Sequence, residues 1–212
     1  SVFGRRWNEQ QKQLLRDSRI HSTNNVVQAI ADSGGATRSL INASAIGYYG
    51  DVPEGEVTEQ SGHGEDFLAQ LCVDWEAAAR KAEEHGARVV IVRIGVVLDR
   101  EGGALKQMLT PFKLGLGGPV ASGKQWVSWV HLDDLVGIIV QAVESEQFAG
   151  VVNGTGPQPL RNKEFSKSLA RALHRPCLFP VPGFMLRVMF GEVAYILTTG
   201  QQVLPTRADD LG

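Results

Sequence analysis

The 212-residue chain has few of the residues that mark secreted or metal-binding proteins. Its only two cysteines, Cys72 and Cys177, do not form a C-x-x-C pair, which favours a reducing compartment, the cytoplasm, over an oxidising one. Its five histidines are scattered, and none stands at metal-ligand spacing from a cysteine or another histidine. The sequence therefore predicts a cytoplasmic protein without a metal site.

Long apolar runs and an excess of charge of one sign are also missing. No window approaches the roughly 18 uninterrupted apolar residues of a membrane-spanning helix. The formal net charge of -2 argues against a broad electrostatic surface for nucleic acid or anionic membranes. With 43% apolar and 21% charged residues, the composition is typical of a globular protein with one core, or one core and a small lobe. The oligomeric state stays open.

The glycine-rich segments lack a complete phosphate-binding turn. Gly118–Lys124 has the spacing of a P-loop, but Gln125 stands where the magnesium-binding hydroxyl belongs, and a strand pattern follows instead of a helix. Pro119 also removes one backbone donor. We therefore favour a mobile loop that covers a ligand over a P-loop phosphotransferase. Gly154-Thr-Gly156 follows a strand, but the third glycine and the helix of a dinucleotide-binding turn are missing.

What is present is an alternation of strand and helix patterns. Arg88–Ile94 is a nearly continuous apolar run, typical of a parallel strand buried on both faces. Alternating strands and helices predict an α/β fold, in which helices cover both faces of a parallel sheet. We expect a loop over residues 45–64. Strands are expected near residues 38–44, 88–94, 125–130 and 151–153, and helices near residues 8–33, 65–85, 103–113, 132–143 and 162–174.

One stretch, Asn42–Gly50, delivers a hydroxyl and two phenols at the end of an expected strand: those of Ser44, Tyr48 and Tyr49. In open α/β sheets, ligands bind in the crevice outside the carboxyl ends of the strands. We therefore interpret this stretch as part of a functional site. The alternative is a strand end whose Ser and Tyr side chains only satisfy local hydrogen bonds.

Charged residues elsewhere have simpler structural interpretations. Arg93 interrupts a buried strand, so its guanidinium must find a partner, and a structural ion pair is the favoured role. Asp133 and Asp134 begin a helix after His131, where carboxylates suit the positive end of the helix dipole. That capping role explains the two acids without catalysis.

Several motifs follow one another in order along nearly the whole chain. They are Gly47-Tyr48-Tyr49-Gly50, Leu71-Cys72-Val-Asp-Trp75-Glu76, Arg93-Ile-Gly-Val-Val-Leu98, Gly115-Leu-Gly-Gly-Pro119, Trp129-Val-His-Leu-Asp-Asp-Leu135 and Val152-Asn-Gly-Thr155. The series resembles the extended short-chain dehydrogenase/reductase superfamily. More closely, it is similar to an atypical branch of epimerase family proteins, also called nucleoside-diphosphate-sugar epimerase-like, which carry a C-terminal domain of unknown function.

The resemblance implies a doubly wound, Rossmann-like parallel sheet with a small C-terminal substrate lobe. Residues 1–98 and 125–153 would form the NAD(P)-binding domain, and residues 99–124 and 154–212 the substrate lobe. The chain starts at Ser1-Val-Phe-Gly without methionine, and the pyrophosphate turn is missing. We therefore expect a fragment that lacks the N-terminal βαβ part of the fold.

The same resemblance implies that the cofactor is NADP, with NAD as the alternative. Arg19, Ser44 and Val97 match positions that contact the cofactor, and Ser44 also matches the hydroxyl near the reacting carbon. The substrate would be a small molecule, with a nucleotide sugar among the candidates.

The chain departs from the superfamily at its proton-transfer pair. Members use a tyrosine with a lysine four residues later on one helix, and this chain has no Tyr-x-x-x-Lys. Leu68 and Cys72 take that spacing instead. Tyr48 or Tyr49 would then be the acid, with Ser44 orienting the substrate. The predicted function is an NADP-linked oxidoreductase or sugar-nucleotide epimerase-like protein acting on a hydroxyl or carbonyl compound; the alternative is a non-catalytic NADP-binding regulatory or scaffold protein.

Overall fold

Three parallel strands form the centre of the protein. A computed structural model describes residues 6–211. Residues 1–5, where the predicted 1–98 segment starts, and residue 212 lie outside the described part. The order of the strands is β1 (Ser39–Ala45), β3 (Arg88–Ile94) and β7 (Gly150–Gly154). The apolar side chains in the middle of β3 are almost completely buried, which confirms the predicted strand covered on both faces.

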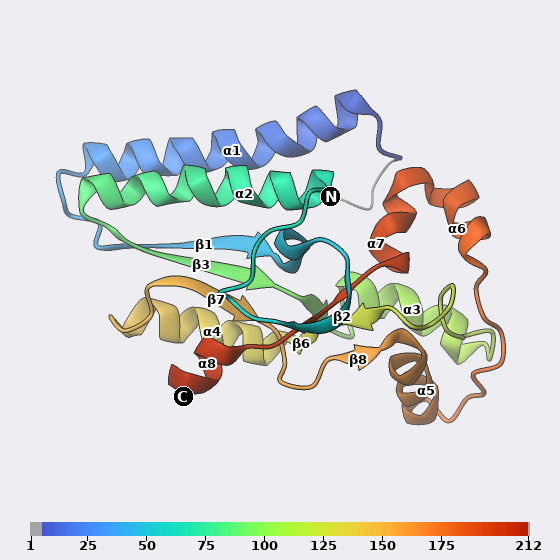
Figure 1. Cartoon of the computed structure of the whole chain (residues 1–212). Coiled ribbons are helices and arrows are strands. Elements are labelled where there is room, and N and C mark those ends of the chain that lie inside the picture. The colour runs from blue at the N-terminus through green and yellow to red at the C-terminus, as the bar shows by residue number, and fades with distance from the viewer. Residues whose placement is uncertain (1–5, 212) are drawn as a thin grey trace.

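Helices cover both faces of this sheet (Figure 1). α1 (Glu9–Asp32) and α2 (Phe67–Arg80) lie on one face, and α4 (Leu132–Glu144) and α8 (Thr206–Leu211) lie on the other. Because successive side chains of a strand point to opposite faces, Val89 and Ile91 pack on the α1 and α2 side, whereas Val90 and Val92 pack with residues of α4. The predicted doubly wound α/β arrangement is confirmed.

Side-chain caps determine where α1 and α2 begin. Asn8 Oδ1 accepts a 2.7 Å hydrogen bond from the backbone nitrogen of Gln11. Asp66 Oδ1 accepts bonds of 2.8 and 3.0 Å from the backbone nitrogens of Leu68 and Ala69. The α2 helix ends at Arg80, earlier than predicted, and the short 3-10 helix η2 (Lys81–His85) follows it. Asp66 therefore holds the start of α2 beside the carboxyl ends of the strands.

The expected loop over residues 45–64 contains regular structure, which corrects the prediction. The 3-10 helix η1 (Ile46–Tyr49) follows β1 directly, and β2 (Val52–Val57) pairs in parallel with β9 (Gln201–Val203). The Gly, Pro and Glu content of the segment gave no sign of a partner about 145 residues away, so propensity alone predicted a loop.

The predicted strand over 125–130 is two short strands, β5 (Trp126–Val127) and β6 (Trp129–His131). Ser128 separates them, and its hydroxyl donates to the Gln201 carbonyl at 2.7 Å and accepts from the Val203 nitrogen at 2.9 Å. β6 pairs in parallel with β4 (Val96–Leu98), and β5 pairs antiparallel with β8 (Leu160–Arg161). This segment therefore joins the sheet region to the C-terminal part of the chain.

The remaining helices lie beyond the carboxyl ends of the strands, on the side to which the arrows in Figure 1 point. They are α3 (Gly103–Lys113), α5 (Asn162–Ala172), α6 (Gly183–Phe190), η3 (Gly191–Val193) and α7 (Ala194–Thr198). In the glycine-rich loop before β5, the Val120 nitrogen donates to Asn162 Oδ1 and the Ala121 nitrogen donates to the Val181 carbonyl. A strand follows this loop, so it does not have the geometry of a P-loop.

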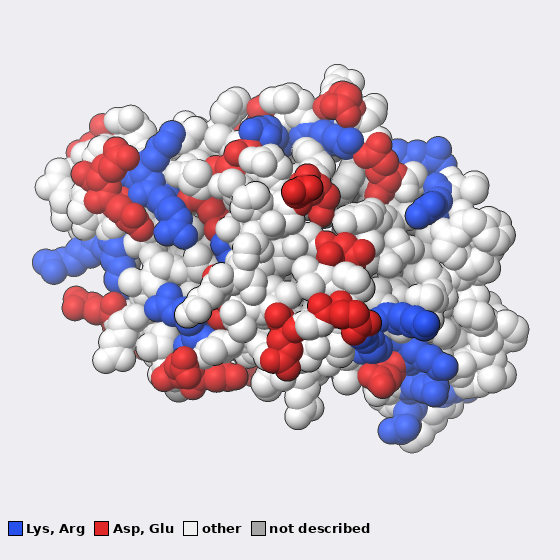
Figure 2. All heavy atoms as spheres, in the orientation of Figure 1, with Lys and Arg blue, Asp and Glu red and all other residues white. Residues whose placement is uncertain are grey.

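Acidic and basic side chains are interspersed over the face shown in Figure 2. Within residues 6–211, no helix combines the length and the apolar character that spanning a bilayer requires. The same residues contain no group of three or more His, Cys, Asp or Glu side chains placed to hold a metal ion.

Gly95 is the residue between β3 and β4, and its backbone packs tightly against Ser128 and Thr155. A Cβ atom there would stand 2.5 Å from the Ser128 carbonyl oxygen and 2.9 Å from Thr155 Cγ2. We expect Gly95→Ala to lower the free energy of unfolding by about 1–3 kcal/mol, because the backbone must shift. Gly137→Ala is the control, since a Cβ in this α4 position meets nothing within 4 Å, and it should stabilise by about 0.5–1 kcal/mol. Urea unfolding measures both, and equal midpoints would contradict this account.

Candidate functional site

Three polar residues lie side by side where the parallel strands end. The strand register places Ser44 of β1 opposite Arg93 of β3, and Arg93 opposite Asn153 of β7. All three are buried, with exposed fractions of 3%, 3% and 0%. Buried polar groups require hydrogen-bond partners, so this row needs a network to satisfy it.

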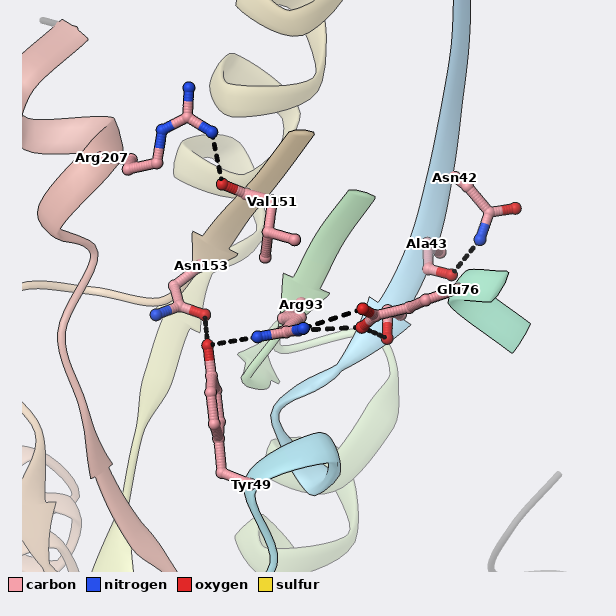
Figure 3. A network of polar contacts seen from close by, with 9 residues as sticks. Asn42, Ala43, Tyr49, Glu76, Arg93, Val151, Asn153 and Arg207 are labelled. Carbon is pink, nitrogen blue, oxygen red and sulfur yellow. Dashed lines mark hydrogen bonds and ion pairs between the residues drawn. The ribbon is translucent and has the colours of Figure 1, made fainter. Parts of the chain in front are cut away.

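A buried ion pair forms the centre of that network (Figure 3). Arg93 Nε and Nη2 donate to Glu76 Oε1 and Oε2 of α2, each at 2.8 Å. This two-bond geometry matches the planar guanidinium to the carboxylate. Ser44 Oγ donates a third bond to Glu76 Oε1 at 2.7 Å. The predicted structural ion pair of Arg93 is therefore confirmed, and its partner is Glu76.

The pKa of Arg93 reflects two opposing effects. Burial lowers it, whereas the hydrogen bonds to Glu76 and Tyr49 raise it by more, so the net direction is upward. The guanidinium is therefore a permanent positive charge at the end of β3.

Tyr49 occupies the second side of the guanidinium and is almost completely buried. Arg93 Nη1 donates to the Tyr49 hydroxyl at 3.0 Å, and that hydroxyl donates to Asn153 Oδ1 at 2.7 Å (Figure 3). Burial raises the pKa of Tyr49, and the charge of Arg93 offsets only part of that effect. The phenolic proton of Tyr49 is thus held by Asn153, which suits a structural role better than proton transfer.

The network continues from Asn153 into the C-terminal part of the chain. Asn153 Nδ2 donates to the Leu204 carbonyl at 2.9 Å, and the Asn153 nitrogen donates to Glu59 Oε1 at 3.0 Å. The backbone nitrogen of Arg207 also donates to Glu59 Oε1. The chain from β1 to α8 is therefore connected through one set of hydrogen bonds.

Tyr48 lies against the same guanidinium, with its ring facing Arg93. The Arg93 guanidinium carbon stands 3.3 Å from the centre of the Tyr48 ring, and the ring meets Tyr49 and His63 edge-on. The Tyr48 side chain is half-buried, and its hydroxyl makes no hydrogen bond to any of residues 6–211. Of the two predicted tyrosines, Tyr49 donates its phenolic proton to a neighbour among the described residues and Tyr48 does not.

The other predicted residues lie outside this network. Arg19 Nη1 donates to the Leu15 carbonyl at 3.0 Å, and its guanidinium lies over the Trp75 ring. Val97 is half-buried in β4 and packs against the core on the α4 side. Whether Arg19, Ser44 and Val97 contact a cofactor stays a prediction.

Cys72, which takes the spacing expected for the lysine of the superfamily, is buried next to Ser44. Burial raises the pKa of its thiol to about 11, with a smaller opposing effect from the Ser44 hydrogen bond. The thiol therefore stays protonated near neutral pH and is not a reactive nucleophile.

Comparison with known proteins supplies the family. The model of the "NAD dependent epimerase/dehydratase family" matches residues 2–153, and that of a "Domain of unknown function (DUF1731)" matches residues 181–212. The chain belongs to the NAD dependent epimerase/dehydratase family. The resemblance drawn from the sequence motifs is confirmed, including the C-terminal domain of unknown function.

Relatives cover the whole of the chain. It is 44% identical over 209 residues to the "Epimerase family protein SDR39U1 homolog, chloroplastic" of Arabidopsis thaliana, a match that covers 98% of this chain and 60% of that protein. It is 46% identical over 213 residues to an epimerase family protein of Mycobacterium tuberculosis, covering 100% of this chain and 70% of the relative. The chain thus spans about 60% of the length of the plant relative.

Solved structures agree with the fold. The crystal structure of human epimerase family protein SDR39U1 (isoform 2) with NADPH has a TM-score of 0.93 and 36% identity, and the match covers 99% of this chain and 72% of the human one. A nucleoside-diphosphate sugar epimerase from Corynebacterium glutamicum has a TM-score of 0.79 and 33% identity, with coverage of 97% and 40%. The predicted Rossmann-like fold is therefore confirmed.

Breaking the buried ion pair should be costly. Arg93→Met leaves the Glu76 carboxylate buried without a cation, and we expect it to lower the free energy of unfolding by about 3–5 kcal/mol. The double variant Arg93→Met/Glu76→Leu leaves no buried charge, so it should recover part of that loss.

The control for this pair is a surface ion pair. Glu54, which is exposed, pairs with Arg161 at 3.2 Å, and Glu54→Gln should change the unfolding free energy by no more than about 1 kcal/mol. Urea unfolding compares all the variants. An Arg93→Met loss as small as that of Glu54→Gln would show that the buried pair does not hold the site together.

Proposed function

We propose that this chain forms the substrate-binding and proton-transfer part of an NADP(H)-dependent oxidoreductase or epimerase-like enzyme. The substrate would be a small molecule with a hydroxyl or carbonyl group. Family membership supports the class of reaction, and the human structure with NADPH supports the predicted choice of cofactor. The observation that carries the proposal is the network at the strand ends, which leaves one phenol, that of Tyr48, without a hydrogen-bond partner among residues 6–211.

The chemistry divides between cofactor and protein. NADP(H), when bound, accepts or supplies the hydride. In the reducing direction, Tyr48 donates its phenolic proton to the carbonyl oxygen and regains a proton from solvent. The Ser44 hydroxyl already donates its one hydrogen bond to Glu76, so it can orient a substrate hydroxyl only by accepting a hydrogen bond from it. Arg93 holds the Tyr48 ring in place and does not exchange protons itself.

Cofactor binding is tested with the chain and a longer chimera. Because no complete pyrophosphate turn occurs in this sequence, the 212-residue chain should bind NADPH weakly. A chimera preceded by the N-terminal residues of the Mycobacterium tuberculosis relative should bind it well by calorimetry. In the chimera, Arg19→Ala should weaken binding by about 1.5–3 kcal/mol, the scale of a hydrogen bond to a charged group.

The control for Arg19 is Arg171→Ala, an exposed arginine on α5 that should leave NADPH affinity unchanged. Equal affinity of the Arg19→Ala chimera and its parent would remove Arg19 from the cofactor site. Tight binding by the 212-residue chain alone would refute the expectation that the turn is needed.

The two tyrosines are separated by matched variants of the chimera. Tyr48→Phe should keep NADPH affinity but lower turnover of a carbonyl substrate by about 10²–10⁴-fold, because only the proton donor is removed. Tyr49→Phe should instead lower the unfolding free energy by about 1–3 kcal/mol, since it leaves Asn153 and Arg93 with an unmet hydrogen bond.

Turnover is measured as NADPH consumption with a panel of small carbonyl compounds, and stability by urea unfolding. If Tyr48→Phe turns over like its parent, Tyr48 is not the donor. Tight NADPH binding without turnover of any compound would favour the non-catalytic alternative.

A further inference from the structure

A cavity of about 230 Å³ lies between the start of α2 and the C-terminal helices. Its wall is formed by one residue before α1, three at the start of α2, and two from η3 and α7. These residues are Trp7, Asp66, Phe67, Leu68, Glu192 and Tyr195.

Most of the wall is apolar. Trp7 and Phe67 meet edge-on with their ring centres 5.5 Å apart, and Leu68 extends the same surface. An engineered apolar cavity of about 150 Å³ holds a benzene molecule, so this cavity has room for a ring with a substituent.

Several polar atoms of the wall already have protein partners. Asp66 Oδ1 caps α2, and the Tyr195 hydroxyl donates to Asp66 Oδ2 at 3.3 Å. Glu192 forms an ion pair with Lys12 at 2.8 Å. A sugar would bring several hydroxyl groups to a wall that offers few free partners, and each unpaired group costs binding energy.

The charge around the cavity is negative. Asp66 and Glu192 line it, and Asp51 lies close enough to act on Tyr195: the pKa of Tyr195 is raised by burial first and then by the charges of Asp66 and Asp51. Two cations lie nearby: Lys12 is shared between Glu9 and Glu192, and the Arg6 guanidinium donates to the carbonyls of Val188 and Met189. Anionic groups such as a diphosphate or a carboxylate would therefore be repelled.

The cavity adjoins the network at the strand ends through Leu68. A Cβ atom built on Gly47 would lie 3.5 Å from Leu68 Cβ, and Gly47 directly precedes Tyr48 in η1. A molecule in the cavity thus has one wall in common with the turn that carries the candidate proton donor.

We propose that this cavity binds a ring-sized apolar group of the substrate, and that the substrate is uncharged or cationic at this end. This inference rests on the proposed function, since it names the substrate class of the same site. It also sets this chain apart from neighbours of the same fold whose structures contain a nucleotide sugar, such as the Bacillus cereus epimerase with UDP-glucuronic acid and NAD.

Ligand-observed NMR measures the binding of four probes to the 212-residue chain, three of them fluorinated ring compounds and the fourth a nucleotide sugar. They are 4-fluorobenzyl alcohol, 4-fluorobenzylamine, 4-fluorobenzoate and UDP-glucose. The alcohol should bind with a dissociation constant on the order of 1 mM, the scale for so small a molecule. The amine should bind roughly fivefold or more tightly than the benzoate, because two carboxylates line the cavity. UDP-glucose should not compete with the alcohol.

Two variants tie the binding to this cavity. Leu68→Phe fills the cavity and should weaken binding of the alcohol by about tenfold or more. Leu132→Phe is its control, because Leu132 is an exposed residue of α4 on the opposite face of the sheet. Glu192 is exposed, so the Glu192→Gln variant should fold normally. It is expected to reduce the difference in affinity between the amine and the benzoate, whereas Glu146→Gln, outside the cavity, should leave that difference unchanged.

The outcome separates this inference from the proposed function. Ring probes that fail to bind the parent chain, or that bind Leu68→Phe and Glu192→Gln like the parent, would overturn it even if the chimera binds NADPH. UDP-glucose displacing the alcohol would also overturn it, in favour of a nucleotide sugar. Ring binding in a chimera that does not bind NADPH would uphold the cavity while refuting the proposed function.

Discussion

The ion pair between Arg93 and Glu76 is the interaction on which the carboxyl end of the sheet depends. Removing both charges from water costs several kcal/mol per ion, so the pair persists only with nearly ideal geometry and further hydrogen bonds. Here the guanidinium donates two hydrogen bonds to Glu76 and a third to Tyr49. The Ser44 hydroxyl donates a further hydrogen bond to the Glu76 carboxylate. The strand ends β1, β3 and β7, the turn η1 and the helix α2 are thereby held in one arrangement.

Local patterns in the sequence were sufficient for the main elements. The apolar run of β3 and the cap at Asn8 each predict their structure from a few neighbouring residues. Pairing over long distances was not predictable, because β2 is stabilised by β9, far away in the chain. Ser128 interrupts a strand pattern for a similar reason, since its hydroxyl bonds the backbone of β9. The division into domains near residues 98, 125 and 153 stays a prediction.

The candidate site could be predicted only in part. The strand-end position of Ser44 and the tyrosines followed from the order of elements, and Arg93 clearly required a partner. Glu76 and Asn153 were missed as members of the network, because the register between strands places Asn153 and the packing of α2 on the sheet places Glu76, and no local pattern records either. Tyr48 and Tyr49 are also indistinguishable as neighbours in sequence. Only the geometry of the 3-10 helix η1 shows that Tyr49 donates a hydrogen bond to Asn153 whereas Tyr48 does not.

The tyrosine–lysine pair of the superfamily is missing from this sequence, and the strand ends carry a buried cation, Arg93 of β3. Arg93 is locked into the buried network by its bonds to Glu76 and Tyr49. Nitrogen-resolved NMR of the arginine side chains tests it most directly, through the exchange of guanidinium protons with water. We expect separate, slowly exchanging Nε–H and Nη–H signals for Arg93 at neutral pH. Exchange as fast as that of the exposed Arg100 would contradict it.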